Sequence, residues 1–181
     1  EAGKKFGVSV TVFVSNNANP SKIRCILDAG AQVVHHGQDF DTAKEYGKKA
    51  AIQDKAEFWE DGVVLEMAYG AATIADELIN TNIDWDIILV PVGNGSLIKG
   101  IASLFKEIKP ATKIIGLVTS GAPVMEKAIT GQNFDINEPT NTEADGLEVR
   151  IPIMKISEEV GCLIDDVWII PESMLLPAVK T

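Results

Sequence analysis

Two kinds of hydrophobic pattern alternate along this chain. One is a short run of apolar residues, and the other is a longer segment in which apolar residues recur every three or four positions. Short β-branched runs predict five strands, at residues 10–15, 32–34, 86–92, 113–119 and 167–170. Several of these runs carry apolar residues at consecutive positions, which is typical of strands covered on both faces. Between the runs, apolar residues recur every three or four positions and predict helices at residues 20–29, 40–53, 63–79 and 97–108. This order predicts an α/β fold in which helices flank parallel sheets.

Capping and turn residues support the predicted helices. Asn19 stands where an N-cap is expected, Pro20 follows at the first helical position, and Gly30 ends the helix. The glycine, alanine and proline at residues 121–123 predict the start of a further helix. The polar residues 131–143 predict a surface loop.

The length of the chain allows one domain of ordinary size or two small lobes. The alternation of predicted strands and helices is interrupted near residue 60, where one predicted helix has ended and the next has not yet begun. We therefore divide the chain into a first lobe, residues 1–60, and a second lobe, residues 61–181.

Composition restricts the partners and the location. A formal charge of −10 at pH 7 argues against nucleic acid and anionic membrane surfaces, since both require a basic face. No apolar run reaches about 18 residues, so no membrane-spanning helix is predicted. Cys25 and Cys162 lie far apart, without the spacing of a metal finger or a redox motif, which predicts two reduced, buried thiols in a cytoplasmic protein.

The candidate chemistry lies in one loop, where a buried strand runs directly into Gly93-Asn94-Gly95-Ser96 and a helix starts at once. Small residues let the backbone turn tightly and approach a ligand, and the first N–H groups of a helix have no internal partner. Such a helix start suits a phosphate, with the Ser96 hydroxyl as a further donor. The alternative is a glycine-rich turn without a ligand, because the spacing of neither a P-loop nor a dinucleotide-binding loop is present.

Several motifs occur together, in the order found in one enzyme family. They are Asn19-Pro20-x-Lys22, Gly30-Ala-x-Val-Val34, Glu60-Asp61-Gly62, Gly70-Ala-Ala-Thr73, Val90-Pro-Val-Gly-Asn-Gly-Ser-Leu97 and Ala144-Asp145-Gly146. In this set the chain resembles the fold-type-II pyridoxal-phosphate-dependent enzymes, and among them the serine/threonine dehydratases and serine racemases. The resemblance implies a tryptophan-synthase-β-like α/β fold of twisted parallel sheets with flanking helices. Residues 1–60 would be part of the small lobe and residues 61–181 part of the large, cofactor-binding lobe.

The resemblance also implies an activity and a cofactor site. The expected activity is that of an ammonia-lyase, which carries out β-elimination from a hydroxy-amino acid with pyridoxal 5′-phosphate as the electron sink. The implied phosphate site consists of Gly93, Asn94, Gly95, Ser96 and Leu97, and Asp145 and Gly146 would lie near the cofactor ring. The implied partners are a small amino-acid substrate and, in the complete enzyme, further copies of the same chain.

Two departures from the family restrict what this chain is expected to do. The family's Schiff-base lysine belongs to a motif upstream of Glu1, and Ser21-Lys22-Ile23-Arg24 imitates only part of that motif. We therefore expect Lys22 to be an exposed helical lysine. We expect the chain to be an incomplete, inactive fragment that lacks both ends and any catalytic residue. Some relatives bind a divalent cation, but the two acidic positions read Val118 and Val124 here, which predicts no metal site.

Two other functions remain open from the sequence. One is a cysteine-synthase-like enzyme of the same fold that catalyses β-replacement. The other is a non-catalytic binding or interaction domain that retains the fold and has lost the chemistry. The motifs Glu60-Asp61-Gly62 and Ala144-Asp145-Gly146 favour the dehydratase over the β-replacement enzyme.

Overall fold

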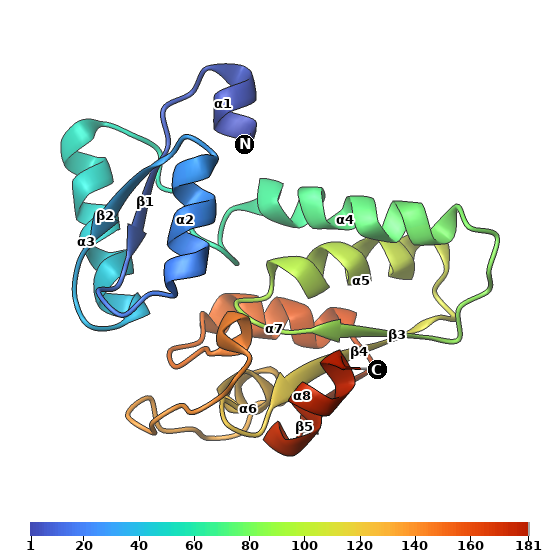
Figure 1. Cartoon of the computed structure of the whole chain (residues 1–181). Coiled ribbons are helices and arrows are strands. Elements are labelled where there is room, and N and C mark those ends of the chain that lie inside the picture. The colour runs from blue at the N-terminus through green and yellow to red at the C-terminus, as the bar shows by residue number, and fades with distance from the viewer. Residues whose placement is uncertain (181) are drawn as a thin grey trace. The chain divides into compact units, whose positions relative to one another are not determined.

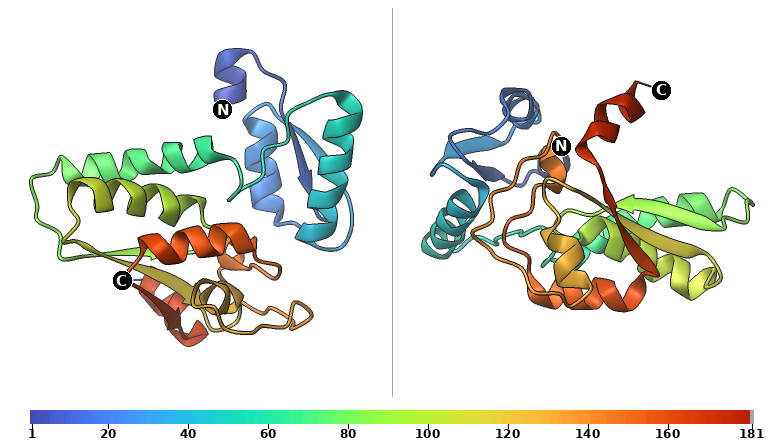
Figure 2. Two further views of the ribbon diagram at one scale, coloured as in Figure 1. Left: turned by 180° about the vertical axis from the view of Figure 1, so that it is seen from behind. Right: turned by 90° about the horizontal axis from the view of Figure 1, so that it is seen from below.

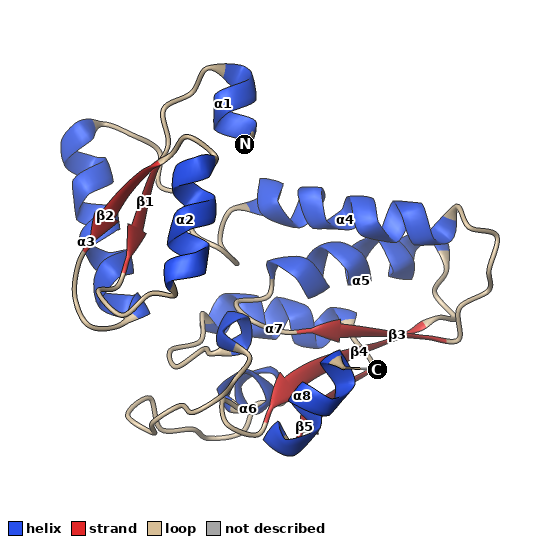
Figure 3. Cartoon of the chain, in the orientation of Figure 1, coloured by secondary structure: helices blue, strands red, loops and turns tan. Residues whose placement is uncertain are grey.

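Two separate parallel sheets organise the chain in the computed structural model, which describes residues 1–180 (Figure 1). Each sheet belongs to its own structural unit, and the units comprise Glu1–Phe58 and Trp59–Thr181. The α/β class with parallel strands and flanking helices is as predicted (Figure 3). No helix within residues 1–180 combines the length and the apolar character needed to cross a membrane.

The first unit pairs β1 with β2 in parallel and flanks them with helices. Its elements in chain order are α1 (Ala2–Phe6), β1 (Thr11–Val14), α2 (Pro20–Asp28), β2 (Gln32–His35) and α3 (Phe40–Asp54). The Asn19 side chain accepts a hydrogen bond of 2.9 Å from the Ser21 N–H, so Asn19 is the predicted N-cap of α2. α3 packs on β1 at Gly47, where an added Cβ would lie 2.8 Å from Cδ2 of Phe13.

The second unit is built on a three-stranded parallel sheet with the order β3-β4-β5. Its elements are α4 (Leu65–Ile79), β3 (Ile87–Pro91), α5 (Ser96–Ile108), β4 (Lys113–Thr119), α6 (Val124–Ile129), the 3-10 turn η1 (Asp145–Leu147), α7 (Met154–Leu163), β5 (Asp166–Ile170) and α8 (Glu172–Val179). Because the strands are parallel, their carboxyl ends at Pro91, Thr119 and Ile170 lie along one edge of the sheet. Ligands of parallel α/β folds bind at this edge.

α5 is at the centre of the hydrophobic core of the second unit. Ile98 and Phe105 on α5 are fully buried against Val90 of β3 and Ile114 of β4. α4 lies beside α5 (Figures 1 and 2), and an added Cβ on Gly100 would lie only 2.2 Å from the Ala68 carbonyl oxygen. A residue without a side chain is thus required where these two helices meet.

All five predicted strands are present, but the predicted burial of both faces is wrong for two of them. β4 is buried almost throughout. In β3, however, Val90 is buried whereas Ile87 and Leu89 are 46% and 52% exposed, and Trp168 in β5 is 44% exposed. The hydrophobic core of this unit lies on the face of the sheet that carries Val90. Within residues 1–180, a run of consecutive apolar residues therefore did not show whether a strand is buried on one face or on both.

The four predicted helices correspond to α2, α3, α4 and α5, and the further helix expected after residues 121–123 is α6. The polar residues 131–143 form a long loop without helix or strand, as predicted (Figure 3). α7 and α8 have no counterpart in the prediction, and Figure 2 shows α8 projecting away from α5 and α7. The expected burial of the thiols is also wrong, because Cys25 on α2 and Cys162 on α7 lie on the exposed sides of their helices.

Candidate functional site

The loop between β3 and α5 lies at the carboxyl edge of the three-stranded sheet. Gly95 is the N-cap of α5 and has a φ of 103°, a conformation that favours glycine. The backbone N–H groups of Gly95, Ser96 and Leu97 have no hydrogen-bond acceptor among residues 1–180. They are the unpaired donors of a helix start, and such donors can bind an anion.

A second segment, residues 60–62, is attached to this loop by a buried hydrogen bond. The Gly62 N–H donates to Oγ of Ser96 over 2.7 Å. Gly62 has a φ of 87°, and an added Cβ would lie 2.5 Å from the Asn94 carbonyl oxygen, so the two backbones are in contact. Because Ser96 is the acceptor of this bond, its own hydroxyl proton remains available to a ligand.

A third segment, the turn η1, contacts the same loop. The carbonyl oxygen of Gly146 lies 2.7 Å from the position that a Cβ on Gly93 would occupy. An added Cβ on Gly95 would likewise lie 2.8 Å from Cγ2 of Ile156 on α7. The structure thus brings the predicted residues 93–97 together with the turn that contains Asp145 and Gly146. It adds residues 60–62 and Ile156, which the sequence did not assign to the site.

The lysine one turn into α5 is engaged elsewhere. The Lys99 ammonium group forms an ion pair with Glu159 on α7. The hydrogen bond from Lys99 lowers the pKa of Glu159 below its ordinary value, against a smaller opposing effect of burial. Lys99 therefore links α5 to α7, and the donors at the loop are neutral N–H and O–H groups. The helix dipole adds about half a positive charge at the same end of α5.

The positions compared with metal ligands are apolar. Val118 in β4 is 1% exposed, and Val124 at the start of α6 belongs to the same hydrophobic core. Within the described residues 1–180, no group of three or more histidine, cysteine, aspartate or glutamate side chains could hold a metal ion. Lys22, the residue compared with the family's lysine motif, is exposed on α2 as predicted.

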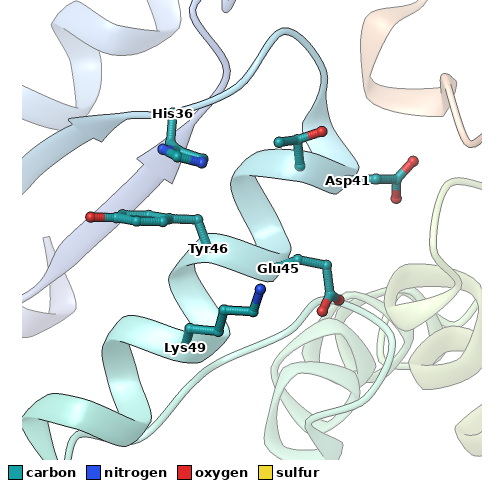
Figure 4. A pocket seen from close by; sticks show the side chains of 6 residues that line it. His36, Asp41, Glu45, Tyr46 and Lys49 are labelled. Carbon is teal, nitrogen blue, oxygen red and sulfur yellow. The ribbon is translucent and has the colours of Figure 1, made fainter.

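A separate pocket of about 370 Å³ lies in the first unit, between the end of β2 and α3 (Figure 4). The residues that line it are His36, Asp41, Thr42, Glu45, Tyr46 and Lys49. The His36 ring stacks on the Tyr46 ring with centroids 3.9 Å apart. Asp41 pairs with Lys44 over 3.4 Å, and Glu45 pairs with Lys48 over 3.2 Å. The acidic groups of this pocket thus already have partners on α3, and we do not assign it to the site.

Comparisons with known proteins point to one family. The family model described as "Pyridoxal-phosphate dependent enzyme" matches residues 1–181. An L-threonine ammonia-lyase of Geobacter sulfurreducens is 32% identical over 176 residues, which cover 96% of this chain and 43% of that protein. The catabolic L-threonine dehydratase of Escherichia coli strain K12 is 30% identical over 169 residues, which cover 92% of this chain and 50% of that protein. The chain therefore spans about half the length of the curated relatives it matches.

Solved structures share the fold. The processed form of threonine deaminase isoform 2 from Solanum lycopersicum has a TM-score of 0.83 at 27% identity, covering 94% of this chain and 50% of that chain. Maize serine racemase has a TM-score of 0.89 at 24% identity, covering 99% of this chain and 54% of that chain. At the identity of the second comparison, the likeness shows the fold alone.

Proposed function

Because this chain belongs to the family of pyridoxal-phosphate-dependent enzymes, we propose that it is part of an ammonia-lyase acting on threonine or serine, and that residues 93–97 hold the cofactor phosphate. One observation carries the proposal, namely the N–H groups of Gly95, Ser96 and Leu97 that have no acceptor within residues 1–180. These donors lie at the start of α5, where a helix favours an anion.

The chemistry of the loop fits a phosphate group. Phosphate oxygens are acceptors, and the loop offers three N–H donors together with the hydroxyl proton of Ser96. Glycine occupies the two positions, 93 and 95, where a side chain would strike Gly146 or Ile156. The loop can therefore stay close to the surrounding backbone while its donors face outward from the helix start.

When bound, pyridoxal 5′-phosphate supplies the electron sink for β-elimination, by which a hydroxy-amino acid becomes a 2-oxo acid and ammonia. In this proposal the chain's own residues bind and orient the cofactor. The N–H groups of the loop hold the phosphate and fix one end of the molecule. We assign Asp145 and Gly146 to the side of the ring, since their turn contacts Gly93 at the same loop.

One observation favours this function over the β-replacement enzyme, namely that threonine ammonia-lyases and dehydratases are among the relatives. A non-catalytic domain would have the same unpaired N–H groups, because every helix start has them, so the absence of turnover in the assay below would identify it.

The test is an assay of the protein expressed from its natural reading frame, with pyridoxal phosphate and with L-threonine or L-serine as substrate. We expect ammonia and the matching 2-oxo acid. Ser96→Glu should abolish this activity, because it places a negative charge where the phosphate would bind. Ser103→Glu, on the exposed side of the same helix, is the matched control. Turnover only with an added sulfur nucleophile, or cofactor binding without turnover, would contradict the lyase.

The proposal extends to the whole enzyme. We assign residues 1–60 to part of its small lobe and residues 61–181 to part of its large, cofactor-binding lobe. We further propose a small amino acid as substrate, a cytoplasmic location and a homo-oligomer. Light scattering on the natural-length protein tests the last point, and a monomer at working concentration would contradict it.

A further inference from the structure

Glu172 lies where two strands of the second unit end. It is the first residue of α8, just after β5, and the last residues of β4 and β5 are paired as Thr119 and Ile170. The Ser120 N–H donates to the Ile170 carbonyl oxygen over 2.9 Å, and the Glu172 N–H donates to Oγ of Ser120 over 3.2 Å. The backbone of Glu172 is therefore fixed at the carboxyl edge of the sheet.

The carboxylate of Glu172 joins two further segments. Its Oε1 accepts a hydrogen bond of 3.1 Å from the Gly121 N–H, in the turn after β4. Its Oε2 accepts from the Thr142 hydroxyl and from the Glu143 N–H, each over 3.2 Å. The two segments also touch directly, since the Asn141 N–H donates to the Gly121 carbonyl oxygen over 2.8 Å. An added Cβ on Gly121 would lie 1.8 Å from the Asn141 carbonyl oxygen.

All of the groups that face this carboxylate donate to it, which favours its ionised form. Burial raises the pKa of Glu172, but the hydrogen bonds from Thr142, Glu143 and Gly121, with a smaller contribution from the Thr119 hydroxyl, together bring the pKa below its ordinary value. The side chain is therefore charged at neutral pH, and hydrogen bonds to a charged acceptor are stronger than those to a neutral one.

The same carboxylate is connected to the candidate site through Thr142. The hydroxyl oxygen of Thr142, which donates its proton to Glu172, accepts a hydrogen bond of 3.1 Å from the Ala144 N–H. Ala144 is the N-cap of η1, the turn whose Gly146 carbonyl oxygen lies against Gly93. A continuous series of contacts thus runs from Glu172 to the loop at the start of α5.

We propose that Glu172 is a positioning residue, and that its carboxylate clamp on Gly121, Thr142 and Glu143 sets the η1 turn against the loop of residues 93–97. The effect on phosphate binding rests on the proposed function, whereas the clamp itself is a property of the chain's own hydrogen bonds. Glutamine has the same shape as glutamate but replaces one oxygen by an NH₂ donor, which would face groups that also donate. Glu172→Gln should therefore release the Thr142–Glu143 segment without leaving a cavity.

The experiment measures amide hydrogen exchange and the binding of inorganic phosphate for the chain of residues 1–181 and its variants. Glu172→Gln should accelerate exchange at residues 143–147 and weaken phosphate binding at residues 93–98 by about fivefold or more. Glu143→Gln is the matched control, because it removes an exposed carboxylate in the same segment and keeps the clamped N–H. Both measurements should be unchanged in that variant.

A second pair of variants decides the question if Glu172→Gln does not fold. Thr142→Val should reproduce the loss, and Thr142→Ser, which keeps the hydroxyl, should restore the values of the unmodified chain. Unchanged exchange at residues 143–147 in Glu172→Gln would overturn the clamp, and so would an equal acceleration throughout the core of the unit. If the unmodified chain binds no phosphate at residues 93–98, the proposed phosphate site is wrong. The hydrogen-exchange rates at residues 143–147 would still test the Glu172 clamp independently.

Discussion

The backbone N–H of Gly62 donates a 2.7 Å hydrogen bond to Oγ of Ser96, and this bond joins two segments that are far apart in the sequence. Gly62 is buried and Ser96 is 9% exposed. A buried N–H needs an acceptor from the protein, because water does not reach it. Ser96 therefore fixes residues 60–62 against the loop while its own proton stays available to a ligand.

Replacing Ser96 by alanine should destabilise the second unit by about 1–3 kcal/mol, since the Gly62 N–H would stay buried without an acceptor. Urea unfolding measures the change in the free energy of unfolding. Ser103→Ala is the matched control, because Ser103 is exposed on the same helix and its hydroxyl donates to the Lys99 carbonyl oxygen over 2.7 Å. The control should change the free energy by less than about 0.5 kcal/mol. Equal effects of the two substitutions would contradict a structural role for the Gly62–Ser96 bond.

Gly93→Ala should also destabilise the second unit, by about 1–3 kcal/mol, through overpacking. The new Cβ would lie 2.7 Å from the Gly146 carbonyl oxygen, so the η1 turn would have to move. Gly70 on α4 provides the control, because a Cβ added there would meet nothing within 4 Å apart from its chain neighbours and the backbone of its own helix. Alanine favours a helix interior over glycine by up to about 1 kcal/mol, so Gly70→Ala should be neutral or stabilising. A fully stable Gly93→Ala chain would show that η1 does not contact the loop.

Asp165 should make the stability of the second unit depend on pH. Its carboxylate accepts from Lys106 and from the Ile114 N–H, each over 2.7 Å. The hydrogen bond from Lys106 and then that from Ile114 lower the pKa of Asp165 below its ordinary value. A lowered pKa in the folded state means that the stabilisation is present above the unfolded pKa and is lost as the pH falls through the folded one. Unfolding free energies measured from pH 7 downward should therefore decrease below about pH 4.

Asp165→Asn should remove the part of this loss that Asp165 contributes, because asparagine does not titrate, whereas Glu159 and Glu172, whose pKa values are also lowered, should keep their own contributions. The comparison is with Glu107→Gln, which removes an exposed carboxylate on α5 and should leave the loss of stability below about pH 4 in place. If the Asp165→Asn chain keeps the full slope below about pH 4, other carboxylates carry the effect.

Magnesium should not stabilise this chain. The resemblance compares Val118 and Val124 with two acidic positions of metal-binding enzymes, and neither side chain offers an oxygen to a hard cation. A ligand that binds only the folded state raises the unfolding temperature, so thermal unfolding with and without millimolar magnesium is a direct measurement. A magnesium-dependent rise that persists at constant ionic strength would be evidence of a cation site that the sequence did not predict.

Local signals accounted for most of the strands and helices, and the failures have physical reasons. α2 has a capping asparagine, a proline in its first turn and a glycine after its end, and it was predicted closely. α7 begins after Ile153 without any side-chain cap, so no capping residue marks its start in the sequence. α8 contains Pro177, a residue that ordinarily argues against a helix interior.

In the candidate site, features formed within one segment of the sequence were predictable, and contacts between distant segments were not. The loop of residues 93–97 was predictable because a strand end, a tight turn and a helix start follow one another in a single segment. The bond from Gly62 to Ser96 and the contact of Gly146 with Gly93 depend on long-range packing, and only the glycines themselves hinted at close backbone approach. The contacts of Glu172 had no sequence signal, since an isolated glutamate reads as a surface residue.

Inorganic phosphate should bind at the start of α5 in the chain of residues 1–181, with a dissociation constant in the millimolar range, on the order of −4 kcal/mol. The affinity is expected to be low because no cofactor ring anchors the anion. In a chemical-shift titration, the amides of Gly95, Ser96 and Leu97 should move most, since their N–H groups have no acceptor within residues 1–180. Ser96→Glu should weaken binding by placing a like charge in the loop, and Ser103→Glu should leave it nearly unchanged. Shifts spread over other segments, or equal effects of the two glutamates, would reduce the loop to a packing turn and remove the main support for the proposed phosphate site.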